Sequence, residues 1–150
     1  MALFETQVTL NCAIDKAFDF LVRPANLVQF SPPEWGLHFI AAPEVIELGS
    51  RLQFKVQNWG QVMNIEHEVI EFERPARFSE RQVRGPFKRW VHDHLMETDA
   101  AGQVVVIDRI AFDPPGGLIG LLVTEKKILE HLEDGFYERH IRLRRLLETG

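Results

Sequence analysis

The order in which strand-like and helix-like segments follow one another constrains the fold of this chain most strongly. Residues 3–12 alternate apolar and polar side chains with a period of two, which predicts a β-strand with one buried face. Two short helices are expected next. Asp15 can cap the first, which Pro24 interrupts. Pro24 suits the first helical position of the second, over residues 25–30, and Pro32 with Pro33 prevents its continuation.

Six further segments have the alternation or the branched and aromatic residues of strands, and turn residues separate them. Between the last two, Ala100, Ala101 and Gly102 suit a three-residue hairpin loop with Gly102 in the left-handed conformation. Such breaks between consecutive strands predict an antiparallel meander. The expected strands are 37–40, 52–56, 61–72, 78–83, 87–97 and 104–112.

Residues 118–147 repeat apolar side chains at helical spacing and contain no proline, so we predict one amphipathic helix of about 45 Å. An antiparallel sheet curls because its strands twist, and a helix laid across its concave side leaves a wedge-shaped space that side chains do not fill. The element order therefore predicts an α+β fold in which the covering helix arrives last and a cavity lies beneath it.

Length and composition bound the class of protein. Because 150 residues is close to the commonest size of one domain, residues 1–150 are expected to form a single domain. Seventeen Lys and Arg against 22 Asp and Glu give a net charge of −5, which disfavours nucleic acid as a partner. A single cysteine, Cys12, excludes an intramolecular disulfide and favours a cytoplasmic location. Without an apolar run of about 18 residues, stable membrane insertion is not expected.

Three local motifs carry a resemblance to a known superfamily: GPFKRWVHDHLMET at 85–98, DRIAFDPPGG at 108–117 and FYER at 136–139. Together with the element order, they resemble the helix-grip superfamily of START domains, birch-pollen-allergen-like proteins and polyketide cyclase/dehydrase proteins, often called SRPBCC. Within it they are similar to a bacterial ligand-binding branch. The resemblance covers nearly the whole chain. It implies a curved seven-stranded antiparallel sheet wrapped around a long C-terminal helix, two short helices between strands 1 and 2, and a deep apolar cavity.

A polar cluster is expected on the inner face of the last two strands. Trp90, His92, His94 and Met96 share one parity on their strand, and Asp108 and Phe112 share the matching face of the next strand. The three-residue loop places Asp108 opposite His94, and His92 opposite Ile110. Because an unpaired buried carboxylate is costly, this spacing predicts a contact between Asp108 and a histidine.

Three roles for this cluster remain open. His67 has the apolar parity of its own strand and is placed with the two histidines. One role is to anchor the polar end of an organic ligand, and another is a purely structural hydrogen-bond network. The third is a zinc site made by His92, His94 and either His67 or Asp108. We expect no metal and no cofactor, because the superfamily that the sequence resembles is not generally a metal family. Of the neighbours Glu80 and Arg81, one is expected at the cavity mouth and the other in water.

Our first functional hypothesis is binding or carriage of a small hydrophobic or amphipathic molecule. The histidines and Asp108 would orient its polar end. A second hypothesis is an enzyme resembling polyketide cyclases, in which a histidine oriented by Asp108 acts as a general base. A third, by analogy with the superfamily, is a chaperone-assisting domain that contacts other proteins. The oligomeric state is left open. The apolar wall of the cavity is expected from Trp90, Met96, Phe112, Leu129 and Phe136.

Overall fold

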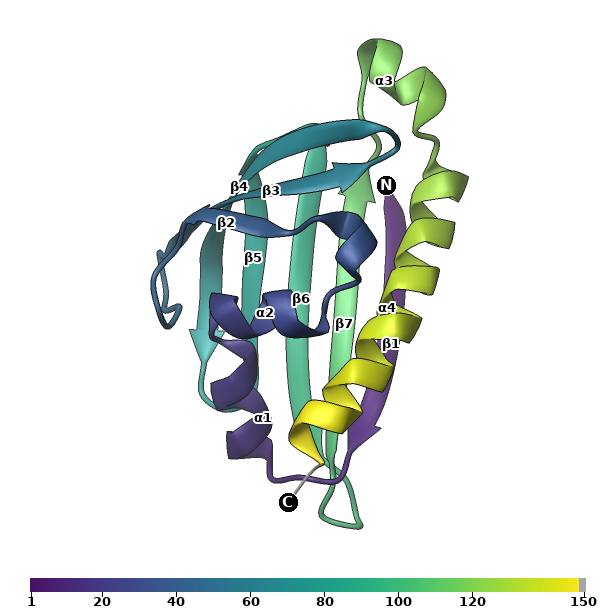
Figure 1. Cartoon of the computed structure of the whole chain (residues 1–150). Helices are drawn as coiled ribbons and strands as arrows, with labels where there is room; N and C mark the ends of the chain where they lie inside the picture. Colours follow the sequence, from purple (N-terminus) through teal and green to yellow (C-terminus); the bar gives the residue numbers. More distant parts are fainter. Residues whose placement is uncertain (149–150) are drawn as a thin grey trace.

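The computed structural model describes residues 1–148, which form a curved seven-stranded antiparallel sheet with helices α1, α2 and α4 in front of it (Figure 1). The strands pair in the order β1-β7-β6-β5-β4-β3-β2, so the first strand lies against the last. The predicted α+β helix-grip arrangement is confirmed. The strands are β1 (Ala2–Leu10), β2 (His38–Ala41), β3 (Arg51–Asn58), β4 (Gln61–Glu73), β5 (Arg77–Arg84), β6 (Arg89–Thr98) and β7 (Val104–Asp113).

The helices fall into two groups. Between β1 and β2 lie α1 (Ile14–Leu21), α2 (Pro24–Phe30) and the short 3-10 turn η1 (Pro33–Trp35). The proline at position 24 stands in the first turn of α2, where its missing N–H removes no helical hydrogen bond. After β7 come α3 (Gly117–Leu122) and α4 (Glu125–Leu147), and α4 runs beside β1 (Figure 1).

The β6–β7 hairpin has the predicted register. Asp99 N–H donates to the Gln103 carbonyl at 2.8 Å, which leaves the expected three-residue loop, and Gly102 has a φ of 81°. His94 therefore pairs with Asp108, and His92 with Ile110. A short loop with a glycine in the left-handed region sets this register locally, so it was accessible from sequence.

The prediction of one unbroken helix over 118–147 is wrong at Val123 and Thr124. Val123 has φ −110° and ψ 84°, outside the helical region, and its side chain is buried. The Thr124 hydroxyl accepts a hydrogen bond from the Lys127 N–H at 3.3 Å and caps α4. As a result α3 projects beyond the sheet (Figure 1). Three of its leucines are exposed. These leucines are Leu118, Leu121 and Leu122.

The core is divided into two apolar clusters. One contains Phe18, Phe78 and Met96 and lies where α1 and the end of α4 meet the sheet. The other contains Phe112 and Phe136 and lies under the first half of α4. His92 and His94 belong to neither cluster, although both side chains are buried. A polar layer therefore separates two hydrophobic regions on the inner face of the sheet.

Candidate functional site

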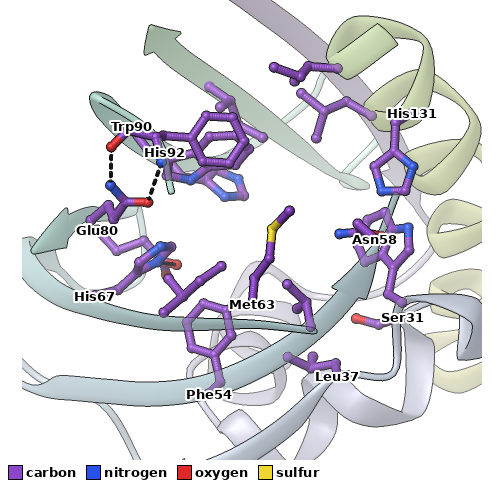
Figure 2. Close-up of a pocket in the computed structure, with 18 of the residues that line it drawn as sticks. Ser31, Leu37, Phe54, Asn58, Met63, His67, Glu80, Trp90, His92 and His131 are labelled. Carbon is purple, nitrogen blue, oxygen red and sulfur yellow. Dashed lines mark hydrogen bonds and ion pairs between the residues drawn. The ribbon is translucent and has the colours of Figure 1, made fainter. Parts of the chain in front are cut away.

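A cavity of about 150 Å³ lies between the inner face of the sheet and the helices. Residues of β3, β4, β5, β6 and β7 form one side of its lining, and residues of α2, η1 and α4 form the other. Figure 2 shows His67 and Glu80 on one side, with Asn58 and His131 across from them. Most lining side chains are apolar, among them Leu27, Leu37, Phe54, Val56, Met63 and Ile65.

Five of the nine residues predicted from sequence line this cavity: His67, Trp90, His92, His94 and Phe136. All but Phe136 lie on strands and share the inward parity expected for them. Phe136 reaches the cavity from α4.

Met96, Phe112 and Leu129 lie elsewhere, which corrects the expected apolar wall. Met96 packs in the first hydrophobic cluster, because β6 passes beneath α1 beyond His94. The Phe112 ring is covered by Trp90, whose centroid lies 5.8 Å away. Leu129 packs beside the second cluster, one residue beyond the cavity-lining Ile128, because successive helical residues point about 100° apart.

Asp108 lies behind the histidines and holds them in place. Its Oδ1 is 2.7 Å from His92 Nε2 and 3.3 Å from His94 Nδ1, which confirms the predicted Asp–His contact. The two imidazole rings stack with centroids 3.8 Å apart and an interplanar angle of 20°. Phe78 stacks on His94 as well, at 4.1 Å. Asp108 thus acts on the cavity through the rings that it contacts.

A second carboxylate, Glu80, extends the network along the sheet. Glu80 Oε1 is 2.7 Å from His67 Nδ1, and Glu80 Oε2 is 3.4 Å from His94 Nε2. Its neighbour Arg81 points outward and pairs with Glu68 at 2.9 Å. The choice between Glu80 and Arg81, which the sequence left open, is therefore settled by the structure in favour of Glu80.

The electrostatics of the network follow from burial and pairing. Burial lowers the pKa of His94, but its pairing with Asp108 and Glu80 outweighs burial and raises that pKa to about 9. Burial, and then the charge on His94, lower the pKa of His92. Burial raises the pKa values of Asp108 and Glu80, but contacts with the histidines hold both well below their usual range. Near neutral pH a charged His94 therefore lies between two carboxylates, and His92 is neutral.

Sequence reasoning expected Arg139 at a solvated helix end, and of the three tryptophans that could border the cavity it selected Trp90 alone, without Trp35 and Trp59. The Arg139 guanidinium lines the cavity from α4 and lies 4.6 Å from the centre of the Phe136 ring. Arg139 and Phe136 are three positions apart on α4, and this i, i+3 spacing is the sequence signal that predicts a contact between them. The His131 ring lies 5.4 Å from Trp35 and 4.9 Å from Trp59. No sequence pattern links these three residues, because they come from three distant segments.

The structure also shows which residues could hold a metal ion. Among the described residues, Glu80, His92 and His94 offer ligand atoms within 4.8 Å of one another. The third ligand that the sequence suggested, His67 or Asp108, is replaced by Glu80 in this set. The lone pair of an imidazole lies in the plane of its ring, and the stacked planes of His92 and His94 do not converge on one point. Chelation by both rings would require one of them to rotate away from its stack.

Comparisons with known proteins identify the architecture. No protein-family model matches the sequence, and no curated protein is significantly similar to it. A structure from Chromobacterium violaceum superimposes with a TM-score of 0.76 at 13% identity, covering 100% of both chains. Major latex-like protein 151 from Panax ginseng gives 0.70 at 14% identity and covers 99% of this chain and 98% of its own. The protein Ara h 8.0201 gives 0.67 at 10% identity over 99% of each chain.

These likenesses show that the chain has the helix-grip fold. At such low identities the shared architecture defines the class of fold and leaves the activity to be argued from the site. Among residues 1–148, none of the helices has both the length and the apolar character needed to span a membrane.

Proposed function

We propose that this chain is a cytoplasmic binding or carrier module for a small hydrophobic or amphipathic molecule, of the kind found in the bacterial ligand-binding branch that its motifs resemble. The observation that carries the proposal is the cavity itself, which is lined mainly by apolar side chains and bordered by a paired polar network. Such a lining buries the body of a ligand, and the polar groups orient its other end.

Cavity size supports this proposal and bounds the ligand. Protein interiors are close-packed and contain few voids larger than a water molecule, so a hollow of about 150 Å³ is unusual for a purely structural core. Apolar cavities of about this volume accept a molecule the size of benzene. A ligand with one aromatic ring, or an aliphatic body of similar size, matches the space.

Native mass spectrometry and thermal shift with panels of lipids, phenols and cyclisable polyketides test the proposal. Small phenols are expected to bind and to raise the melting temperature of the wild-type chain. In Ile65→Trp the larger side chain occupies the cavity, so the shift should disappear. Val62→Trp is the matched control, because Val62 lies on the outer face of the same strand. If no compound binds, or if Ile65→Trp binds as well as the control, the cavity is not a ligand site.

Catalysis is a second candidate, and the state of His92 favours it. When His92 Nε2 donates its proton to Asp108, Nδ1 retains the lone pair and the ring stays neutral. A neutral imidazole oriented by a carboxylate is suited to general-base chemistry on an acidic C–H. Turnover of a cyclisable polyketide by the wild type and its loss in His92→Gln would support this reading. Pure binding predicts no product from either protein.

A further inference from the structure

We propose that the ligand of this cavity carries a carboxylate, and that the guanidinium of Arg139 binds it. The inference rests on the proposed ligand-binding function and narrows the class of ligand. Arg139 lines the cavity from α4, and only 9% of the residue is exposed. Among residues 1–148 it takes part in no ion pair, and its Nε–H has no hydrogen-bond acceptor. A buried cation with a free donor therefore borders a space whose lining is mainly apolar and whose own carboxylate, Glu80, is paired with histidines.

Aromatic rings hold the guanidinium but leave its N–H groups unused. Its central carbon lies 4.8 Å from the ring centre of Phe30, 4.6 Å from that of Phe136 and 5.9 Å from that of Trp35. These cation–π contacts involve the faces of the rings and offer no hydrogen-bond acceptor. Arginine donates through five N–H groups in its own plane, a fork that matches the two oxygens of a carboxylate.

The carboxylates of the protein do not supply that partner. Glu80 is paired with His67 and His94, and Asp108 with His92 and His94. Neither carboxylate lies within ion-pair distance of Arg139, on which both act only through longer-range attraction. Since a buried charge is costly without a direct counterion, an anion brought by the ligand would complete the site.

Other orphaned groups in the lining are also donors. The residues Ser31 and Trp90 line the same cavity, and their Oγ and Nε1 atoms are buried with no partner among the described residues. Ser31 directly follows Phe30, whose ring lies under the Arg139 guanidinium. An indole N–H can only donate, and a hydroxyl has a proton to donate. Acceptor oxygens on a ligand would therefore give both groups a hydrogen-bond partner. His94 Nε2 also lacks a well-directed hydrogen bond, but it faces Glu80 at 3.4 Å.

Charge, donors and volume together describe an aryl carboxylate or a carboxylate with a short aliphatic body. A cavity of about 150 Å³ holds one ring with a small substituent. Benzoate is therefore a suitable probe, and benzamide is its neutral counterpart of nearly the same shape. Comparing the two separates recognition of the anion from burial of the ring.

The test measures dissociation constants of benzoate and benzamide at neutral pH by protein-observed NMR. The wild type is expected to bind benzoate about 10- to 100-fold more tightly than benzamide, the range for hydrogen bonds to charged groups. Arg139→Met keeps an apolar stem but removes the charge, so it should lose this preference and still bind benzamide. Arg139→Lys should retain part of the preference. Arg145→Met, at an exposed position of the same helix, is the control and should behave as the wild type.

Each outcome decides between the two proposals. If the wild type binds both probes equally, or if Arg139→Met keeps the preference, the carboxylate assignment is wrong while ligand binding stands. If phenols bind and benzoate does not, the carboxylate assignment is again wrong and the ligand-binding proposal stands. If no probe or phenol binds, both proposals fail. Thermal unfolding of each variant shows whether it folds. If Arg139→Met does not fold, the ratio of the benzamide and benzoate dissociation constants of the wild type still tests the carboxylate assignment.

Discussion

Asp108 is the residue on which the polar layer depends. Its carboxylate is buried and contacts both His92 and His94, so one side chain orients two cavity-lining rings. His94 in turn keeps its charge in a buried position because Asp108 and Glu80 lie on either side of it. Removing the side chain of any one of these four residues leaves the others buried with a charge or a hydrogen-bonding group that has lost a partner.

Asp108→Asn is expected to destabilise the fold by about 3 kcal/mol, because it leaves the His94 charge with Glu80 alone. Urea denaturation measures the change. Glu97→Gln removes an exposed carboxylate from the same hairpin and should alter stability by less than about 0.5 kcal/mol. Equal effects of the two substitutions would show that the buried pairing adds no stability.

Stability is also expected to depend on pH through His94. Its folded pKa of about 9 lies above the ordinary value of 6.5, so the stabilisation is complete below pH 6.5 and is lost as the pH rises through 9. Above pH 6.5 the lowered pKa of His92 has no effect, because its ring is neutral in both states. Urea denaturation of the wild type across this window should show the decline, and His94→Gln should show a flatter profile. A wild-type profile without a decline contradicts the charged state of His94.

Among the elements, α4 does two separate tasks. Its first half, with Ile128, Leu132 and Phe136, covers the cavity, and its last turns, with Leu143 and Leu147, close the opposite end of the core. The Thr124 cap starts this helix where the sheet ends and separates it from α3. Gly135 permits the close approach of α4 to η1 at the edge of the cavity, since the indole of Trp35 lies where a Cβ would stand.

Gly135→Ala tests this approach. Alanine favours a helix over glycine by about 1 kcal/mol, but here its Cβ overlaps Trp35. We expect a net loss of about 1–3 kcal/mol and a change in tryptophan fluorescence as the indole moves. Glu133→Ala, at an exposed position of the same helix, is the control for helix propensity. A gain in stability from Gly135→Ala would mean that Trp35 moves freely.

The molecule as a whole combines a packed core with a cavity. Shortening a side chain should lower the stability by different amounts in these two regions. Leu132 and Leu143 are both buried on α4, but Leu132 borders the cavity and Leu143 lies in the first hydrophobic cluster. Leu→Ala substitutions in packed cores cost about 2–5 kcal/mol, and the loss depends on the contacts that are removed. Leu132→Ala should therefore lie near the low end of this range and Leu143→Ala near the high end. Chemical denaturation of the two variants measures the difference, and a larger loss for Leu132→Ala would indicate a filled interior.

Local patterns in the sequence determined the strands, the β6–β7 register and the contact of Asp108 with the histidines. Alternation with a period of two and a three-residue loop act between neighbours along the chain, so they are visible without a structure. The break at Val123 was missed because periodicity over 118–147 continues through it, although the capping threonine is itself a local signal.

The tertiary structure alone decided which side chains face the hollow. Glu80 points inward and Arg81 outward because the Glu80 carboxylate pairs with His67 and His94 on the neighbouring strands. Arg139 is buried because Phe30, Trp35 and Phe136 surround it, and two of these three residues precede it by about a hundred positions. Strand periodicity specifies a face of the sheet, but the burial and pairing of a group on that face depend on segments that only folding brings together.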